Sequence, residues 1–168
     1  MLAPELETAL NEQLTKETYS SYLYLAMCAH FESAGYPGFA GWMRAQAEEE
    51  HLHAMRFFDH INDRDGRVRL DAIGVPPVEF GTPLEVFEAS LAHEREITAS
   101  IEALYERSDR STQAFLDWFL TEQVEEEKTV GQIVDTLRLA GDSGPSLLLL
   151  DRELGARGAG DGDAGSGA

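Results

Sequence analysis

Cysteine is almost absent from this sequence, whose 168 residues include one, Cys28. A single cysteine cannot form a disulfide within the chain or supply the paired thiolates of a zinc knuckle, so both are excluded. We expect Cys28 to be an inert thiol in the core. A metal site within this chain would therefore rely on oxygen and nitrogen ligands.

Basic residues are also scarce, with 13 lysines and arginines against 31 aspartates and glutamates, a formal net charge of -18. Nucleic acids and anionic lipid surfaces bind clustered lysine and arginine side chains. The charge therefore argues against a nucleic-acid partner and against a membrane partner, and it favours cations as ligands.

Long apolar runs are missing as well, since none approaches the roughly 20 residues that a membrane-spanning helix needs. Residues 1–13 lack a basic region followed by an apolar segment, which a secretion signal would show. We therefore expect a cytoplasmic protein. The length and the 43% hydrophobic content fit one globular domain.

Four segments carry apolar residues at helical spacing, and no segment alternates as a strand would. They span about residues 5–31, 39–62, 82–107 and 111–140. Residues 66–82 hold several prolines and glycines, and they are too many for an ordinary helix hairpin loop of about 2 to 8 residues. We therefore predict an all-α four-helix bundle with one long crossover connection.

The ends of the segments carry capping signals. Thr82, followed by proline and then by Glu85, predicts a capped helix start, and Ser111 is the predicted cap of the fourth helix. A short fifth helix is expected over residues 145–154, which closes a domain of residues 1–154. The Gly, Ala and Asp composition of residues 155–168 predicts a disordered tail.

Each apolar stripe is interrupted near its middle by polar residues that fall on or beside the core face. These residues are Glu17 and Tyr24 in the first segment, Glu50 and His53 in the second, Glu94 in the third, and Gln123 and Glu126 in the fourth. Glu50 and His53 lie one helical turn apart, so both can reach one point. We expect all seven to lie at one level of the bundle.

Several carboxylates facing one another in an apolar interior are costly to bury, and the stripes contain no lysine or arginine to neutralise them. A highly charged cation offsets the burial and the repulsion together. Glutamate oxygens with one imidazole suit iron, manganese or zinc. The pattern therefore predicts a metal centre.

The acidic run at residues 122–127 is denser than one such centre requires. One interpretation is an exposed acidic face, which suits Glu127. The other is an accessory cation site, formed by Glu122, Glu125 and Glu126 together with Glu49.

These residues closely resemble the bacterial non-haem ferritins. The likeness is carried by Glu17, Tyr24, the Glu49-Glu50-x-x-His53 segment, HERE around Glu94, and WFLTEQVEEEK at residues 118–128. It covers residues 1 to about 155, and it implies a ferritin-like four-helix bundle with a short fifth helix.

The resemblance also implies roles for the residues. Glu17, Glu50 and His53 would hold one iron ion, while Glu50 would bridge to a second iron held by Glu94, with Gln123 nearby. Tyr24 would hydrogen-bond a ligand and supply an electron. A third iron site would be formed by Glu49, Glu122, Glu125 and Glu126.

The activity that follows from the resemblance is that of a ferroxidase. Fe(II) would be oxidised to Fe(III) by dioxygen or hydrogen peroxide and stored as a ferric mineral inside a hollow homo-oligomeric shell of 24 subunits. No haem is expected, because His51 stands where bacterioferritins place a haem-ligating methionine. Rubrerythrins would require Cys-x-x-Cys pairs, which one cysteine cannot supply.

Two other functions would use the same buried acids. A non-catalytic scaffold could hold structural cations there, without redox turnover. A di-iron oxygenase acting on an organic substrate would want an apolar cavity and a second histidine ligand, and the fourth segment reads EQVEEE without one.

Overall fold

The computed structural model describes residues 2–158 and confirms an all-α fold, with five helices and no strand in that range. The helices are α1 (Pro4–Ala34), α2 (Pro37–Asp63), α3 (Pro83–Glu106), α4 (Arg110–Ala140) and α5 (Gly144–Gly158). None of these described helices has both the length and the apolar character needed to cross a membrane.

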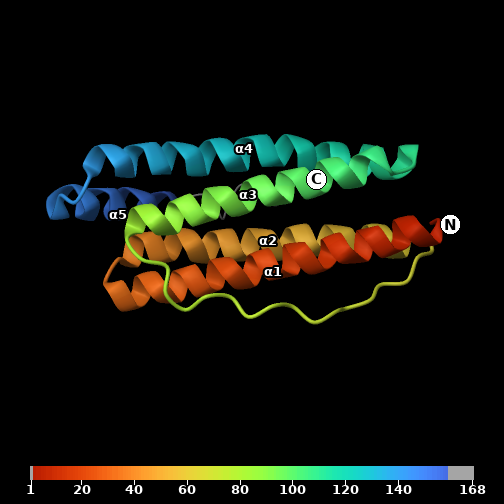
Figure 1. Cartoon of the computed structure of the whole chain (residues 1–168), viewed down its shortest axis with the longest axis horizontal. Coiled ribbons are helices and arrows are strands. Elements are labelled where there is room, and N and C mark those ends of the chain that lie inside the picture. Colours follow the sequence, from red (N-terminus) through yellow and green to blue (C-terminus); the bar gives the residue numbers. More distant parts are fainter. Residues whose placement is uncertain (1, 159–168) are drawn as a thin grey trace.

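The four long helices form a bundle of two antiparallel pairs, α1 with α2 and α3 with α4 (Figure 1). Residues 64–82 run as an extended connection along the outside of α1, from one end of the bundle to the other. The predicted crossover is therefore confirmed, and because of it α2 and α3 run in the same direction.

Local sequence explains where the helices begin. The Thr82 side chain accepts a hydrogen bond from the Glu85 backbone, and the Glu85 carboxylate accepts one from the Thr82 backbone, which completes the predicted capping box. The predicted cap of α4 was wrong. Asp109, and not Ser111, accepts a hydrogen bond from the backbone of Thr112, and its carboxylate is also bound by Arg64, which favours this earlier start.

The fifth helix is longer than the sequence indicated. It continues to Gly158, past the predicted end at residue 154 and into the segment expected to be disordered. The rest of that predicted tail, residues 159–168, lies outside the described residues.

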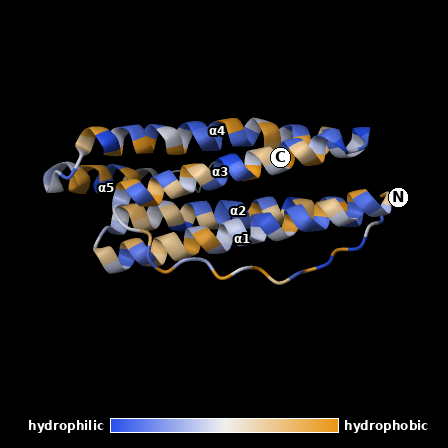
Figure 2. Ribbon diagram, in the orientation of Figure 1, coloured by the Kyte–Doolittle hydropathy of each residue, from blue (hydrophilic) through white to orange (hydrophobic). Residues whose placement is uncertain are grey.

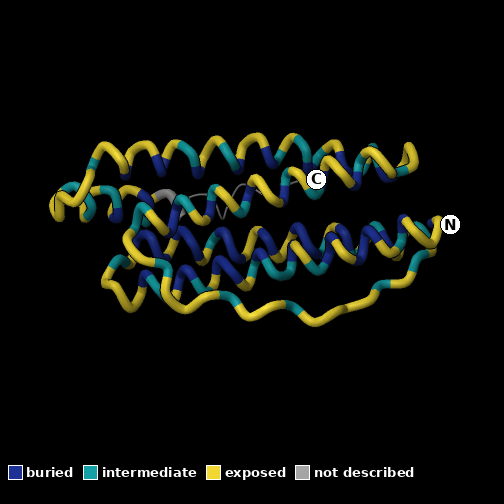
Figure 3. The backbone as a smooth tube through the Cα atoms, in the orientation of Figure 1, coloured by how far each residue is buried: buried dark blue, intermediate teal, exposed yellow. Residues whose placement is uncertain are grey.

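Two apolar clusters fill the bundle, one at each end. The first, around Phe31, Phe39 and Phe87, lies near α5, and the second, around Leu10 and Phe57, lies toward the amino terminus. Hydrophobic and hydrophilic residues alternate along every helix (Figure 2), and the buried faces point between the helices (Figure 3). Six of the seven interrupting residues lie between the two clusters along their helices, which confirms one level for those six. The expectation is wrong for Tyr24, whose ring belongs to the first cluster and whose hydroxyl reaches Glu94.

Helix α5 docks on the start of α2 by close backbone contact. A Cβ atom added to Gly38 would lie 1.7 Å from the Asp151 carbonyl oxygen, so only glycine fits. The buried Asp151 carboxylate accepts a hydrogen bond of 2.8 Å from the backbone of Phe39, where the α2 dipole favours negative charge. This contact fixes α5 against α2.

Replacing Gly38 by alanine should loosen α5, since the new methyl group cannot fit without moving Asp151. We expect Gly38→Ala to lower the free energy of unfolding by about 1 to 3 kcal/mol, as overpacking does, and to expose α5 to limited proteolysis. Gly41→Ala is the matched control in the same helix. A Cβ there meets nothing within 4 Å, so this change should be neutral or stabilising. Equal melting temperatures for both variants would contradict the contact.

Candidate metal centre

The polar layer between the apolar clusters is strongly acidic. Four glutamates are buried in it, namely Glu17, Glu50, Glu94 and Glu126, and His53 and Gln123 are buried beside them. No lysine or arginine is buried among residues 2–156, the range whose side-chain burial is described. The carboxylates of this layer therefore have no basic partner in the core.

Glu17, Glu50 and His53 form the tightest group of the layer. One ligand atom from each lies within 4.8 Å of the others, and Nδ1 of His53 is 3.4 Å from Oε2 of Glu50. The His53 ring is held edge-on by Trp118 and Phe119. Oε2 of Glu17 and Oε1 of Glu50 are buried without any hydrogen-bond partner. Two unpaired oxygens beside an imidazole are an arrangement that a cation would satisfy.

Burial makes these carboxyl groups poor acids while no cation is bound. Burial, followed by repulsion from Glu50, raises the pKa of Glu17 from 4.5 to about 8. Burial and the charge of Glu94 raise the pKa of Glu50 well above 4.5. Because a cation needs the charged forms, binding must release protons near neutral pH.

Glu94 is held by hydrogen bonds from two neighbours. The Tyr24 hydroxyl donates to its Oε1, and Nε2 of Gln123 donates to its Oε2 at 3.2 Å. Tyr24 has one proton to give, so the Ser90 hydroxyl, 2.9 Å away, must donate to the tyrosine oxygen. Tyr24 and Gln123 were expected beside a ligand, and in the structure both donate to Glu94.

A second group of ligand atoms adjoins the first. Single atoms of Glu49, His53, Glu122 and Glu126 lie within 4.8 Å of one another. Burial and the charge of Glu94 raise the pKa of Glu126 to about 9, and Nε2 of Gln46 donates to its Oε2 at 2.6 Å. His53 therefore belongs to both groups.

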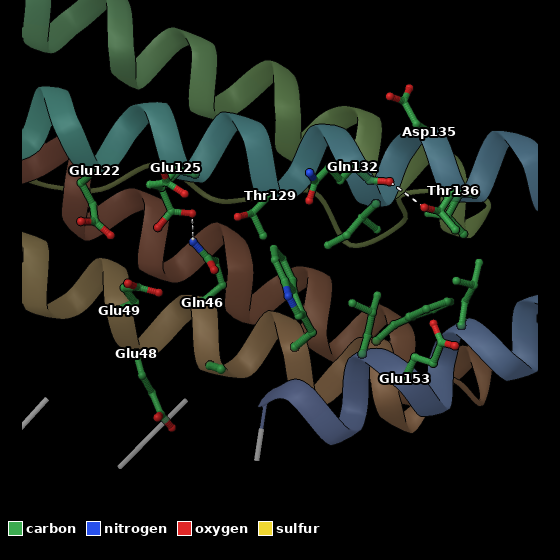
Figure 4. Close-up of a pocket in the computed structure, with 18 of the residues that line it drawn as sticks. Gln46, Glu48, Glu49, Glu122, Glu125, Thr129, Gln132, Asp135, Thr136 and Glu153 are labelled. Atoms are coloured by element: carbon green, nitrogen blue, oxygen red, sulfur yellow. Dashed lines mark hydrogen bonds between the residues drawn. The ribbon is translucent and has the colours of Figure 1, made fainter. Parts of the chain in front are cut away.

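Glu125, the remaining residue of the predicted accessory site, does not belong to that second group. It is exposed and lies 3.7 Å from the Lys128 ammonium. Figure 4 shows Glu49, Glu122 and Glu125 along one groove, with the Glu48 carboxylate pointing away from those of Glu122 and Glu125. The groove holds about 1220 Å³ between α2, α4 and α5, and Asp135 and Glu153 add acidic groups farther along it.

Sequence reasoning missed two buried glutamines that serve the acidic layer. Gln13 donates to Oε1 of Glu17 at 2.7 Å, and Gln46 donates to Glu126. Each lies one helical turn from an identified residue, Gln13 before Glu17 and Gln46 before Glu50. That spacing was the available indication, but glutamine is common on exposed helix faces and does not mark itself as buried.

Comparison with known proteins now identifies the fold family. The sequence profile of the ferritin-like domain family matches residues 7–140. This chain belongs to the ferritin family. The non-heme ferritin of Bacteroides fragilis (strain 638R) is 44% identical over 161 residues, which cover 94% of this chain and 100% of that protein. The non-heme ferritin of Staphylococcus aureus (strain USA300) is 38% identical, covering 94% of this chain and 97% of that protein.

Solved ferritin structures have the same architecture. An open-pore ferritin from the hyperthermophilic archaeon Archaeoglobus fulgidus superposes with a TM-score of 0.91 at 44% identity, covering 92% of this chain and 98% of that one. An engineered closed form of that ferritin superposes with the same TM-score. The ferritin-like four-helix bundle with a short fifth helix is thus confirmed.

The raised pKa of Glu17 predicts a pH dependence for the metal-free ferritin. Between pH 4.5 and about 8 the folded protein keeps a proton that the unfolded chain has lost, so stability falls as pH rises. Glu17→Gln removes this titration, and it should reduce the slope by as much as about 1.4 kcal/mol per pH unit. Melting curves across that range measure the slope. The exposed Glu48→Gln should keep the wild-type slope, and a Glu17→Gln slope equal to wild type would contradict the assignment.

Proposed function

We propose that Glu17, Glu50 and His53 hold one Fe(II) ion and that Glu50 and Glu94 hold a second, with Glu50 between them. As a ferritin the chain stores iron and is a ferroxidase, oxidising Fe(II) to Fe(III). The observation that carries the residue assignment is the pair of buried, unpartnered oxygens on Glu17 and Glu50 beside His53.

Iron is the substrate, and the protein's contribution is electrostatic. Dioxygen takes one electron from each of the two Fe(II) ions. The surrounding carboxylates favour the higher charge of Fe(III), and this preference is strong in a layer closed by apolar clusters at both ends. Gln123 and Tyr24 orient the Glu94 carboxylate by hydrogen bonds. The proposal also makes Tyr24 an electron donor to the dioxygen being reduced, which its hydrogen bond to Glu94 supports.

A third iron site beside the first two is part of the proposal. Glu49, Glu122 and Glu126 are its best supported ligands, since their oxygens converge with His53. Glu125 lines the same groove and would join through a change of rotamer. The groove's further acids would attract Fe ions to this face.

The assembly is proposed to be a hollow homo-oligomeric shell of 24 subunits, with hydrogen peroxide as a second oxidant. The neighbouring ferritin structures support a shell. A cytoplasmic location is proposed as well, and it fits a chain whose one cysteine is buried and unpaired.

His53→Ala should abolish rapid oxidation of Fe(II), because it removes the nitrogen ligand shared by both groups. We expect the initial rate of Fe(II)-dependent oxygen uptake to fall by at least about tenfold, since even changes outside the ligands cost about that much. Glu17→Ala should behave alike. His51→Ala is the matched control, an exposed histidine two residues away in the same helix. Unchanged initial rates in both ligand variants would reject the assignment.

Removing a ligand of the third site should change the binding stoichiometry. Under anaerobic conditions we expect Glu122→Ala to bind one Fe(II) ion fewer per subunit than the wild type. Isothermal titration calorimetry measures this number. Glu48→Ala should retain the full number, because Glu48 belongs to neither group of converging ligand atoms. If Glu122→Ala keeps the wild-type stoichiometry, the third site does not lie here.

A further inference from the structure

Gln13 occupies a buried position with no role in the ligand set. It is 2% exposed, and its Nε2 donates to Oε1 of Glu17 at 2.7 Å. The other oxygen of that carboxylate, Oε2, has no partner. One oxygen of Glu17 is thus engaged by the protein, and the second is left for a ligand.

The orientation of the Gln13 amide is set from outside the layer. The Lys16 ammonium can only donate, and it donates to the Ser100 hydroxyl of α3 at 2.6 Å. Ser100 therefore gives its single proton to Oε1 of Gln13, also at 2.6 Å. With Oε1 occupied in this way, the amide must present Nε2 to Glu17. All three hydrogen bonds donate in the same direction, from the surface toward the carboxylate, and such chains strengthen one another.

The opposite orientation of the amide would defeat metal binding. A flipped Gln13 would place its carbonyl oxygen against Oε1 of Glu17, which repels a carboxylate and accommodates only the protonated acid. A lysine or arginine at position 13 would also orient Glu17, but its positive charge would compete with the cation. A neutral donor held by a directed chain avoids both problems.

We propose that Gln13, oriented by Ser100 and Lys16, is a positioning residue that holds Glu17 with Oε2 turned toward the first iron ion. The inference rests on the proposed function, since Glu17 must be an iron ligand. Ser100 and Lys16 line a small pocket of about 320 Å³ between α1, α3 and the crossover segment. Lys16 and Ser100, at the outer end of this series of hydrogen bonds, are therefore accessible from the surface, while Gln13 and Glu17 at its inner end are buried.

The test is an anaerobic Co(II) titration, followed by absorption, of the full-length protein and its variants. Gln13→Met keeps side-chain length and removes the donor, and it should raise the dissociation constant of the first Co(II) by about 10- to 100-fold. Ser100→Ala should raise this dissociation constant by about threefold to tenfold, because the Gln13 carbonyl oxygen loses the hydrogen bond that fixes the orientation of its amide. Ser100→Thr keeps the hydroxyl and should remain within about twofold of wild type.

Oxidation kinetics separate positioning from catalysis. For Gln13→Met and Ser100→Ala we expect the half-saturating Fe(II) concentration to rise by a larger factor than the saturating rate falls. Ser108→Ala, which removes a hydroxyl bonded only within its own segment, should leave both unchanged. A purely structural role would lower the melting temperature without this split.

Each outcome decides between the claims. If Gln13→Met and Ser100→Ala bind Co(II) as the wild type does, or if Ser100→Thr is as impaired as Ser100→Ala, the positioning role is overturned. If Gln13→Met does not fold, the comparison of Ser100→Ala with Ser100→Thr still tests the positioning role, because Ser100 is partly exposed. A wild-type protein that binds no Co(II) and oxidises no Fe(II) would instead overturn the proposed function.

Discussion

The structure depends on burying four carboxylates in one layer with no lysine or arginine to neutralise them. Apolar clusters above and below that layer exclude water and hold the helices together, so the acids cannot relax outward. In the absence of a cation burial raises the pKa of each of these groups and disfavours its charged form. A bound cation would satisfy the two oxygens that have no hydrogen-bond partner among the described residues. The burial of unneutralised carboxylates therefore lowers the stability of the metal-free protein and also favours the binding of a cation.

Neutral hydrogen-bond donors shape this layer. Glu17, Glu94 and Glu126 each accept a hydrogen bond from a glutamine amide, namely Gln13, Gln123 and Gln46. An amide orients a carboxylate without cancelling its charge, so the negative potential remains available to a metal ion. Glu50 lies against the imidazole of His53, 3.4 Å away.

Much of this molecule could be predicted from its sequence, because a helical period is a strong constraint. The spacing located all four long helices and the polar residues in their stripes. The first and last residues of the helices were harder to predict. Asp109 and Ser111 are both good N-caps for α4, and the contact with Arg64, which favours Asp109, comes from a distant part of the sequence. The glutamine donors escaped notice because a buried amide and an exposed one look alike in a sequence. The place of Glu125 depended on rotamers and on the distance between α2 and α4.

The position of His53 links the two ligand groups. One imidazole ring contributes to both, and Trp118 and Phe119 hold that ring in place. A neutral imidazole has one nitrogen with a free lone pair, so an ion bound to the ring in one group leaves no lone pair for the other, and its charge adds repulsion. Occupancies of neighbouring sites then become interdependent, and by reciprocity each weakens the other by the same factor. Such antagonism would favour passage of iron over its permanent retention at the centre.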